Sequence, residues 1–290
     1  MTTELQADRY LDATGLAPVE TSAERVIRPA KRRLRLRDLL REGPVIRVVA
    51  ARDFRVKYKQ SLLGPIWLVV QPLALLIGFL IAFRGLADVQ TVDVPYLPFA
   101  LVGLSVWAFF QAAMMVGTLS LIAASTYIRF TPCPRPAFPI ASVTASLPAF
   151  GVTALGALVA AAAWGCLSPR ALLIPIGLVW LFVLTVGIVA ISSSVAVRYR
   201  DIVNVLPLLL QVGLFVAPVG YPLTELSTKI RTIVELNPLT GIMEGLRWMV
   251  LSGYDPSLTA IGLSVGGTAL IAFGGWQLFS RLEPTMADDI

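Results

Sequence analysis

Long uncharged runs separated by short charged segments cover most of the chain from about residue 60 onward. About 20 apolar residues cross the hydrocarbon core of a bilayer, and one charge at a helix centre costs about 2.5–3.5 kcal/mol on insertion scales. The runs therefore predict an all-α integral membrane protein with six transmembrane helices. The expected spans lie at residues 60–83, 96–118, 138–163, 171–197, 202–222 and 256–280.

The segments at the two ends have a different pattern. Residues 1–36 are polar and unpatterned and lack the apolar region of a signal peptide, which predicts a disordered basic cytoplasmic tail. Residues 37–64 mix apolar and basic positions at loose helical spacing, which predicts an amphipathic helix in the membrane interface, ended by Gly64-Pro65. Residues 65–282 would form the six-span domain, and residues 283–290 a second cytoplasmic tail.

The distribution of charge predicts the orientation of these spans. Of the 24 lysines and arginines, 13 lie between Arg25 and Lys59. With a cytoplasmic N-terminus, 19 of the 24 lie inside and five outside, which agrees with the positive-inside rule. We therefore expect both termini in the cytoplasm.

Composition excludes several other classes. Apolar residues make up 56% of the chain and charged residues 14%, whereas soluble domains carry about 25% charged residues. A basic flank beside apolar spans indicates contact with anionic membrane lipid, so the net charge of +6 does not indicate nucleic acid. Cys133 and Cys166 lie in separate loops and the chain has no histidine, so we expect no disulfide scaffold, metal site or Cys–His catalysis.

Two segments between the spans have distinctive sequences. The cytoplasmic loop "ASTYIRFTPCPRPAFPIAS" has prolines at 132, 134, 136 and 139, which predict a stiff turn that is either a docking surface or a plain turn. The external segment 221–253 is too polar to span. Its pattern predicts two short helices broken at Asn237-Pro238 that dip into the outer leaflet as a gate. The expected gate residues are Glu225, Lys229, Arg231, Glu235, Asn237 and Pro238.

Four motifs together resemble the membrane subunit of ABC-2 type exporters. They are "RDFRVKYKQSLLGPIWLVVQPL", "RYRDI", "APVGYP" and "ELNPLTGIMEGLRWMVLSG", in order over about residues 45–282. The resemblance is greatest to permeases of O-antigen, capsule, teichoic acid and galactan export. It implies a bacterial inner-membrane protein that pairs with a second copy of itself and two nucleotide-binding ATPase subunits. Its implied substrate is a glycan linked to a polyprenyl diphosphate.

The resemblance also implies where the ATPase docks. The chain contains no G-x-x-x-x-G-K-[ST] and no Gly-Lys, so we expect it to bind no cofactor itself and expect ATP and Mg in the partner. The loop at 127–139 resembles the family's coupling helix, and the helix at 45–59 its second contact. The coupling residues would be Tyr127, Arg129, Phe130, Pro132, Pro134, Arg135 and Pro136.

Cations at the start of the first span suit a diphosphate. An isolated ion in a medium of low dielectric costs on the order of tens of kcal/mol, so the head group needs positive charge at its entrance. The candidates are Arg52, Arg55, Lys57 and Lys59. Alternatively, these residues contact only anionic lipid or the ATPase.

Aromatic residues offer faces along which a sugar chain can move. The candidates for a channel lining are Trp67, Phe79, Phe83, Trp107, Phe109, Phe110, Phe215 and Tyr221. The resemblance places spans one and five beside the dimer axis. Many aromatic residues near span ends are instead interfacial anchors.

Two other functions stay open. An ABC-2 permease for drugs or small lipids would differ only in substrate. A membrane-embedded enzyme acting on lipid-linked sugars would need paired acidic residues, and the external acids show no pair with the spacing of a site, so no catalytic residue is assigned. These acids are Asp88, Asp93, Glu225, Glu235 and Glu244.

Overall fold

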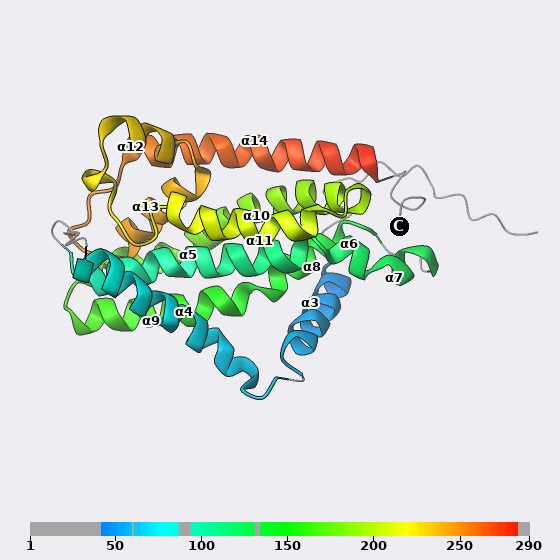
Figure 1. Cartoon of the computed structure of the whole chain (residues 1–290), viewed down its shortest axis with the longest axis horizontal. Helices are drawn as coiled ribbons and strands as arrows, with labels where there is room; N and C mark the ends of the chain where they lie inside the picture. Colours follow the sequence, from blue (N-terminus) through cyan, green and yellow to red (C-terminus); the bar gives the residue numbers. More distant parts are fainter. Residues whose placement is uncertain (1–41, 60, 87–93, 131–133, 284–290) are drawn as a thin grey trace, which may run out of the picture. The chain divides into compact units, whose positions relative to one another are not determined.

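The computed structural model describes residues 42–59, 61–86, 94–130 and 134–283, all within one unit of the chain (Figure 1). Within these ranges the structure is helical, with one isolated β-bridge between Leu167 and Leu251, which confirms the all-α prediction. The helices are α3 (Gly43–Tyr58), α4 (Trp67–Phe79), α5 (Tyr96–Gly117), α6 (Ser120–Ala123), α7 (Ser125–Phe130), α8 (Ala137–Ala145), α9 (Leu147–Ala163), α10 (Ile174–Arg198), α11 (Ile202–Val216), α12 (Thr228–Glu235), α13 (Pro238–Val250) and α14 (Leu258–Leu282). The 3-10 turns are Gly64–Ile66, Pro169–Leu173 and Leu223–Glu225, and a π-helical stretch, Leu80–Leu86, continues α4.

Five helical stretches of the described chain are long and apolar enough to cross a membrane. They are Gly64–Phe83, Tyr96–Gly117, Ala137–Ala163, Pro169–Arg198 and Leu258–Leu282, and they coincide with five of the six expected spans. The remaining expected span, 202–222, contains only α11, whose 15 residues extend about 22 Å. That length is short of a hydrocarbon core about 30 Å thick.

The segment after the second span differs from the expectation of a loop. Residues 120–130 form α6 and α7, because no proline interrupts them and their apolar side chains have partners in the fold. Leu121, Ala124 and Ile128 pack with Phe138 of α8 and Phe279 of α14 in a small buried cluster. This cluster orders the chain up to the proline-rich turn.

The core of the bundle surrounds α5. In the apolar stretch of α5, 72% of the residues are buried, against 17% in the stretch that contains α4. Helices α8, α9, α10 and α13 all pack against α5. The large side chains of Phe99, Leu104 and Phe109 on this helix are fully buried. Helix α5 is therefore the central element of the bundle, on which these four helices pack.

Helices α12 and α13 lie beside the N-terminal part of α14, and α6 to α8 lie toward its C-terminal part (Figure 1). Leu223, Val234 and Ala260 form a buried cluster at the first of these ends. At the other end, Arg135 donates a hydrogen bond to the carbonyl of Glu283. The two expected short helices of the segment 221–253 are present as α12 and α13.

Two glycines allow α10 and α14 to approach closely. A Cβ atom added to Gly275 would lie 2.4 Å from the carbonyl oxygen of Gly187. A Cβ atom added to Gly187 would lie 2.9 Å from the Cα atom of Ala272. Both obstacles are backbone atoms that cannot rotate away. Small residues therefore set the distance between these two helices, as in other membrane bundles.

We predict that Gly275→Ala lowers the apparent unfolding temperature of the protein in detergent by several degrees, because overpacking a close contact costs about 1–3 kcal/mol. Gly274→Ala is the matched control, since a Cβ atom there meets nothing within 4 Å. Alanine is the better helix former, so this control should be neutral or slightly stabilising. Equal unfolding temperatures for the two variants would contradict the close packing of α10 and α14.

Candidate functional site

The chain leaves helical geometry after α11 and remains buried. Residues 217–220 are buried and their carbonyl groups are not part of a helix. The Tyr96 hydroxyl donates to the carbonyl of Gly220 at 2.9 Å. Arg247 Nη2 donates to the carbonyls of Pro218 at 2.6 Å and Val219 at 2.9 Å. Buried backbone oxygens cost free energy unless they are hydrogen-bonded, so these two side chains stabilise the turn.

Arg247 projects from α13 and is 0% exposed. Its guanidinium carbon lies 3.6 Å from the ring centroid of Phe99, a cation–π contact with α5. Its Nη1 atom lies 3.4 Å from Oε1 of Glu244, three residues earlier and therefore on the same helix face. A buried charge is tolerated only when it is paired and hydrogen-bonded, and Arg247 is paired through Nη1 and hydrogen-bonded through Nη2, whereas its Nε atom has no partner among the described residues.

Glu244 is the counter-ion of Arg247 and is 2% exposed. Its Oε1 atom accepts a hydrogen bond from the Tyr254 hydroxyl at 2.7 Å, and its Oε2 atom accepts from the backbone N–H of Ser257 at 3.0 Å. Burial raises the pKa of the Tyr254 hydroxyl well above its ordinary value despite the nearby charge of Arg247. The hydroxyl therefore stays protonated and remains a donor to the carboxylate.

A second acid extends this network to α12. Glu235 Oε1 accepts from Ser257 Oγ at 2.8 Å and from Arg231 Nε at 2.9 Å. Ser257 also caps α14, because its Oγ atom accepts from the backbone N–H of Ala260. One serine thus joins both acids to the start of α14.

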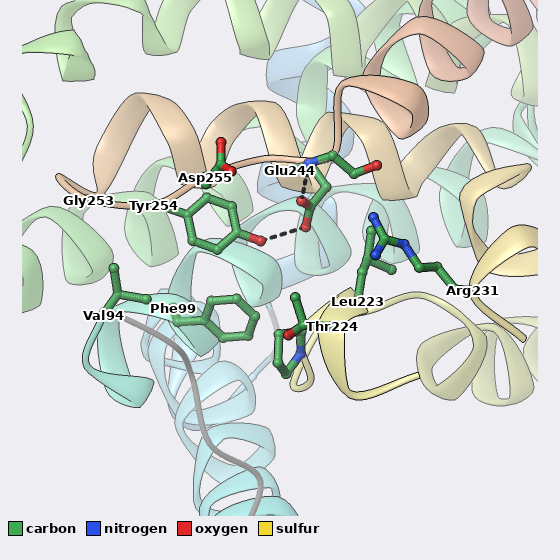
Figure 2. A pocket seen from close by; sticks show the side chains of 11 residues that line it. Val94, Phe99, Leu223, Thr224, Arg231, Glu244, Gly253, Tyr254 and Asp255 are labelled. Atoms are coloured by element: carbon green, nitrogen blue, oxygen red, sulfur yellow. Dashed lines mark hydrogen bonds between the residues drawn. The ribbon is translucent and has the colours of Figure 1, made fainter. Parts of the chain in front are cut away.

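These side chains border a cavity of about 250 Å³. Figure 2 shows the rings of Phe99 and Tyr254 on one side of it and Arg231 on the other, with the Tyr254 hydroxyl directed at Glu244. The lining comes from α5, the 3-10 turn after residue 222, α12, α13 and the loop before α14. The lining residues are Val94, Phe99, Pro222, Leu223, Thr224, Arg231, Glu244, Gly253, Tyr254, Asp255 and Ser257.

The expected gate residues fall into two groups. Arg231 and Glu235 belong to the network, and Asn237 accepts from the backbone N–H of Leu239 as the cap of α13, directly before Pro238. Glu225 and Lys229 are exposed. No ion pair involving either is present in the described ranges.

Sequence reasoning missed the centre of this site. Arg247 is one of the five lysines and arginines that the sequence places on the outer side, and Glu244 is one of the external acids for which the sequence predicts no paired acid. The available signal was their spacing of three residues on a helix that is otherwise mainly apolar. Such a pair on one helix face predicts an ion pair within the helix, although it does not predict that the pair is buried.

The expected channel aromatics separate in the structure. Phe79, Phe83 and Tyr221 come together, with ring centroids 5.4 Å apart for the first two and 5.9 Å for the last two. A Cβ atom added to Gly220 would lie 3.1–3.2 Å from the rings of Phe79 and Phe83. The Tyr221 hydroxyl donates to the carbonyl of Phe215 at 2.9 Å. This group joins the end of α4 to the turn after α11.

The other expected lining residues lie elsewhere. Trp107 and Phe110 are buried in α5 with ring centroids 5.8 Å apart, and Phe109, also buried, stacks edge-on with Phe150. Trp67 and Phe215 have exposed side chains on α4 and α11. Within a single chain, only these last two lie on an open surface.

The expected head-group cations lie in the C-terminal half of α3 and, for Lys59, at the residue directly after it. Arg52 is already paired, because its Nη2 atom lies 2.9 Å from Oδ1 of Asp53 and its guanidinium carbon lies 5.2 Å from the Tyr127 ring centroid. Arg55, Lys57 and Lys59 are exposed. Lys57 Nζ lies 5.5 Å from the ring centroid of Tyr58, and Arg55 Nε donates to the carbonyl of Ala51. None of these three forms an ion pair with a described residue.

The expected coupling residues flank the turn between α7 and α8. Tyr127, on α7, contacts Arg52 and so joins the coupling segment to α3. Arg129 and Phe130 end α7, and Pro134, Arg135 and Pro136 precede α8. Pro132 lies outside the described residues. Helix α3 packs on α8, so the two predicted ATPase contacts adjoin.

These features define a class of protein. The chain is a multi-pass helical membrane protein with a cationic helix at one end and a buried ion-pair network at the other. No group of three or more histidine, cysteine, aspartate or glutamate residues in the described part of the chain is arranged to hold a metal ion.

Comparison with known proteins gives the family. The model of the ABC-2 type transporter family matches residues 44–251, so the chain belongs to that family. It is similar to an O-antigen export system permease protein RfbA of Klebsiella pneumoniae, with 25% identity over 83% of this chain and 93% of the relative. A protein of the same description from Myxococcus xanthus is 23% identical over 88% of this chain and 98% of the relative.

We predict that Arg247→Gln destabilises the protein severely. The change leaves Glu244 buried without its counter-ion and removes the donor to two buried carbonyls. Breaking a buried ion pair costs about 3–5 kcal/mol. The unfolding temperature and the yield of monodisperse protein in detergent measure the effect. The control is Lys229→Gln on the exposed side of α12, which should leave both quantities unchanged. A stable Arg247→Gln protein would show that the turn after α11 does not depend on this side chain.

Proposed function

We propose that this chain is the permease subunit of an ATP-driven exporter that moves a lipid-diphosphate-linked polysaccharide from the cytoplasmic to the outer side of a bacterial inner membrane. Family membership supports transport, and the names of the relatives support a glycan substrate. The observation that carries the proposal is the cationic end of α3, which leads directly into the first membrane stretch.

The proposed chain has six spans and two cytoplasmic termini. Helix α11 is the short fifth span, and the buried turn after it completes the crossing. Irregular backbone at membrane depth is tolerated where protein groups satisfy it, and Arg247 and Tyr96 do so here. In this orientation α12 and α13 are the outer gate, and α3 and α7 face the cytoplasm.

The exposed cations of α3 are the proposed entrance for the diphosphate. Arg55, Lys57 and Lys59 form no ion pair with a described residue, so their charge is available to an anion from the cytoplasmic side. Arg52 has a different role, since it is held between Asp53 and Tyr127. It would transmit movement of the coupling segment to the entrance helix.

The proposed ATPase contact is the surface formed by α7, the proline-rich turn and α3. Tyr127 is half exposed on this surface. ATP and Mg would bind in the partner, and this chain would supply a rigid surface that moves with it. Two such ATPase subunits would serve two copies of this chain.

The proposed second copy faces α4 and α11. Both helices expose apolar side chains, among them Trp67, Ile77, Leu208 and Phe215. They also expose uncharged polar side chains, namely Gln71 of α4 and Asn204 and Gln211 of α11. Polar side chains in membrane helices usually face protein or a water-filled cavity. A dimer with these faces inward would give the glycan a path with both apolar and hydrogen-bonding groups.

The test of the proposed function is to purify the chain from its native membrane by a C-terminal tag and identify what accompanies it. An ATPase with a phosphate-binding loop is expected in near-equal amount. Replacing residues 127–136 with a flexible segment should release that ATPase while the permease stays monodisperse. Absence of any ATPase under conditions that preserve other membrane complexes would overturn the proposal.

We predict that the double variant Arg55→Gln, Lys59→Gln reduces glycan export several-fold without lowering the amount of protein in the membrane, because the entrance loses two charges. The measurement is the amount of glycan on the cell surface. The charge-conserving variant Arg55→Lys, Lys59→Arg is the matched control and should retain export. Unchanged export in the neutral variant would show that these cations contact only lipid or the ATPase.

A further inference from the structure

The cavity beside Glu244 is distinct from the proposed entrance and channel lining. We propose that it binds one neutral sugar residue of the glycan at the outer face of the membrane. This assignment rests on the proposed function, because it takes its ligand from the exported chain. It adds a saccharide site within each protomer to the gate formed by α12 and α13.

The walls of the cavity suit the ring of a sugar. Phe99 is fully buried and packs against Tyr254, with centroids 6.0 Å apart and ring planes inclined at 52°, so the half-buried Tyr254 ring is the aromatic surface open to the cavity (Figure 2). The apolar C–H face of a sugar ring packs on such surfaces. The volume of about 250 Å³ is smaller than the about 300–1,000 Å³ of sites for drug-sized molecules. The cavity therefore suits a single ring.

The rim of the cavity holds both donors and acceptors that are not used within the fold. The Thr224 and Asp255 side chains are exposed and form no hydrogen bond with a described residue. Arg231 uses only its Nε atom, in the contact with Glu235, so its terminal nitrogens are available. Sugar hydroxyls both donate and accept hydrogen bonds. A site that presents a carboxylate, a hydroxyl and a guanidinium matches them.

The charges around the cavity disfavour an anion. Arg231 is paired with Glu235 and Arg247 with Glu244, so these four side chains are balanced. Asp255 then leaves the lining with an excess of negative charge. A phosphate or diphosphate would meet this excess, whereas an uncharged sugar would not. The cavity is thus suited to a different part of the substrate from the cationic helix α3.

The site is also held in shape before a ligand arrives. Glu244 fixes the Tyr254 ring through the hydroxyl and fixes the start of α14 through Ser257. Phe99 is fully buried and is held by Arg247. Sites whose groups are already ordered lose less conformational freedom on binding.

The test is saturation-transfer NMR on the purified transporter complex in lipid nanodiscs. The probes are the methyl glycosides of galactose, mannose and rhamnose, with inorganic phosphate as the anionic comparison. We expect saturation transfer to at least one glycoside. Inorganic phosphate should not reduce this signal, because it should not compete for the cavity. Asp255→Ala or Thr224→Val should weaken glycoside binding about fivefold, the effect of one lost hydrogen bond.

Matched controls lie on the same surface. Thr232→Val on α12 and Ser252→Ala before Tyr254 change exposed residues that do not line the cavity, so glycoside binding should persist. Binding that is absent, or equal in the cavity variants and the controls, would overturn the assignment. If glycan export by the unmodified complex is intact in that case, only the saccharide site fails. If the unmodified complex exports no glycan, the proposed function fails.

Discussion

One buried arginine determines how the end of the bundle beside α12 and α13 is built. Helix α11 stops at Val216, and the buried carbonyl groups of Pro218, Val219 and Gly220 that follow are not part of a helix. Arg247 supplies two of the missing donors and Tyr96 a third. The requirement that buried carbonyls be satisfied thus ties α13 and α5 to the turn after α11.

Because Arg247 is buried and charged, it requires a counter-ion, which is Glu244. This carboxylate also holds the neighbouring segments at the same end of the bundle. Glu244 neutralises Arg247 and orders the loop before α14 through Tyr254 and Ser257. Ser257 in turn reaches Glu235 on α12. A chain of hydrogen bonds therefore runs from the core helix to the surface helix. Most polar atoms of this network are hydrogen-bonded, with Arg247 Nε as an exception among the described residues. Such a network stiffens the structure around it, which suits the frame of a gate and of a small binding cavity.

At the opposite end of the bundle, the cations of and directly after α3 are mainly exposed to solvent, whereas the charges beside α14 are mainly buried and paired. Surface ion pairs contribute little to stability, so the side chains of α3 are free to serve contacts outside the chain. Arg52 is the exception, since it connects α3 to Tyr127 on α7. Movement of the proposed ATPase-facing segment would reach the proposed entrance through this contact. The buried network beside α14 thus fixes the shape of its end of the bundle, whereas the exposed cations of α3 leave their charge available to contacts outside the chain.

The helical membrane class, the positions of five spans, the break at Asn237-Pro238 and the family could all be predicted from the amino-acid sequence. Hydropathy, the positions of prolines and the order of motifs can be read directly from the sequence, because none of them depends on contacts between distant residues. The burial of Arg247 and Glu244, the short length of α11 and the contact of Phe83 with both Phe79 and Tyr221 became evident in the folded structure alone. Burial of a charge depends on carbonyls 28 and 29 residues away along the chain, and residue spacing along one helix does not reveal such partners.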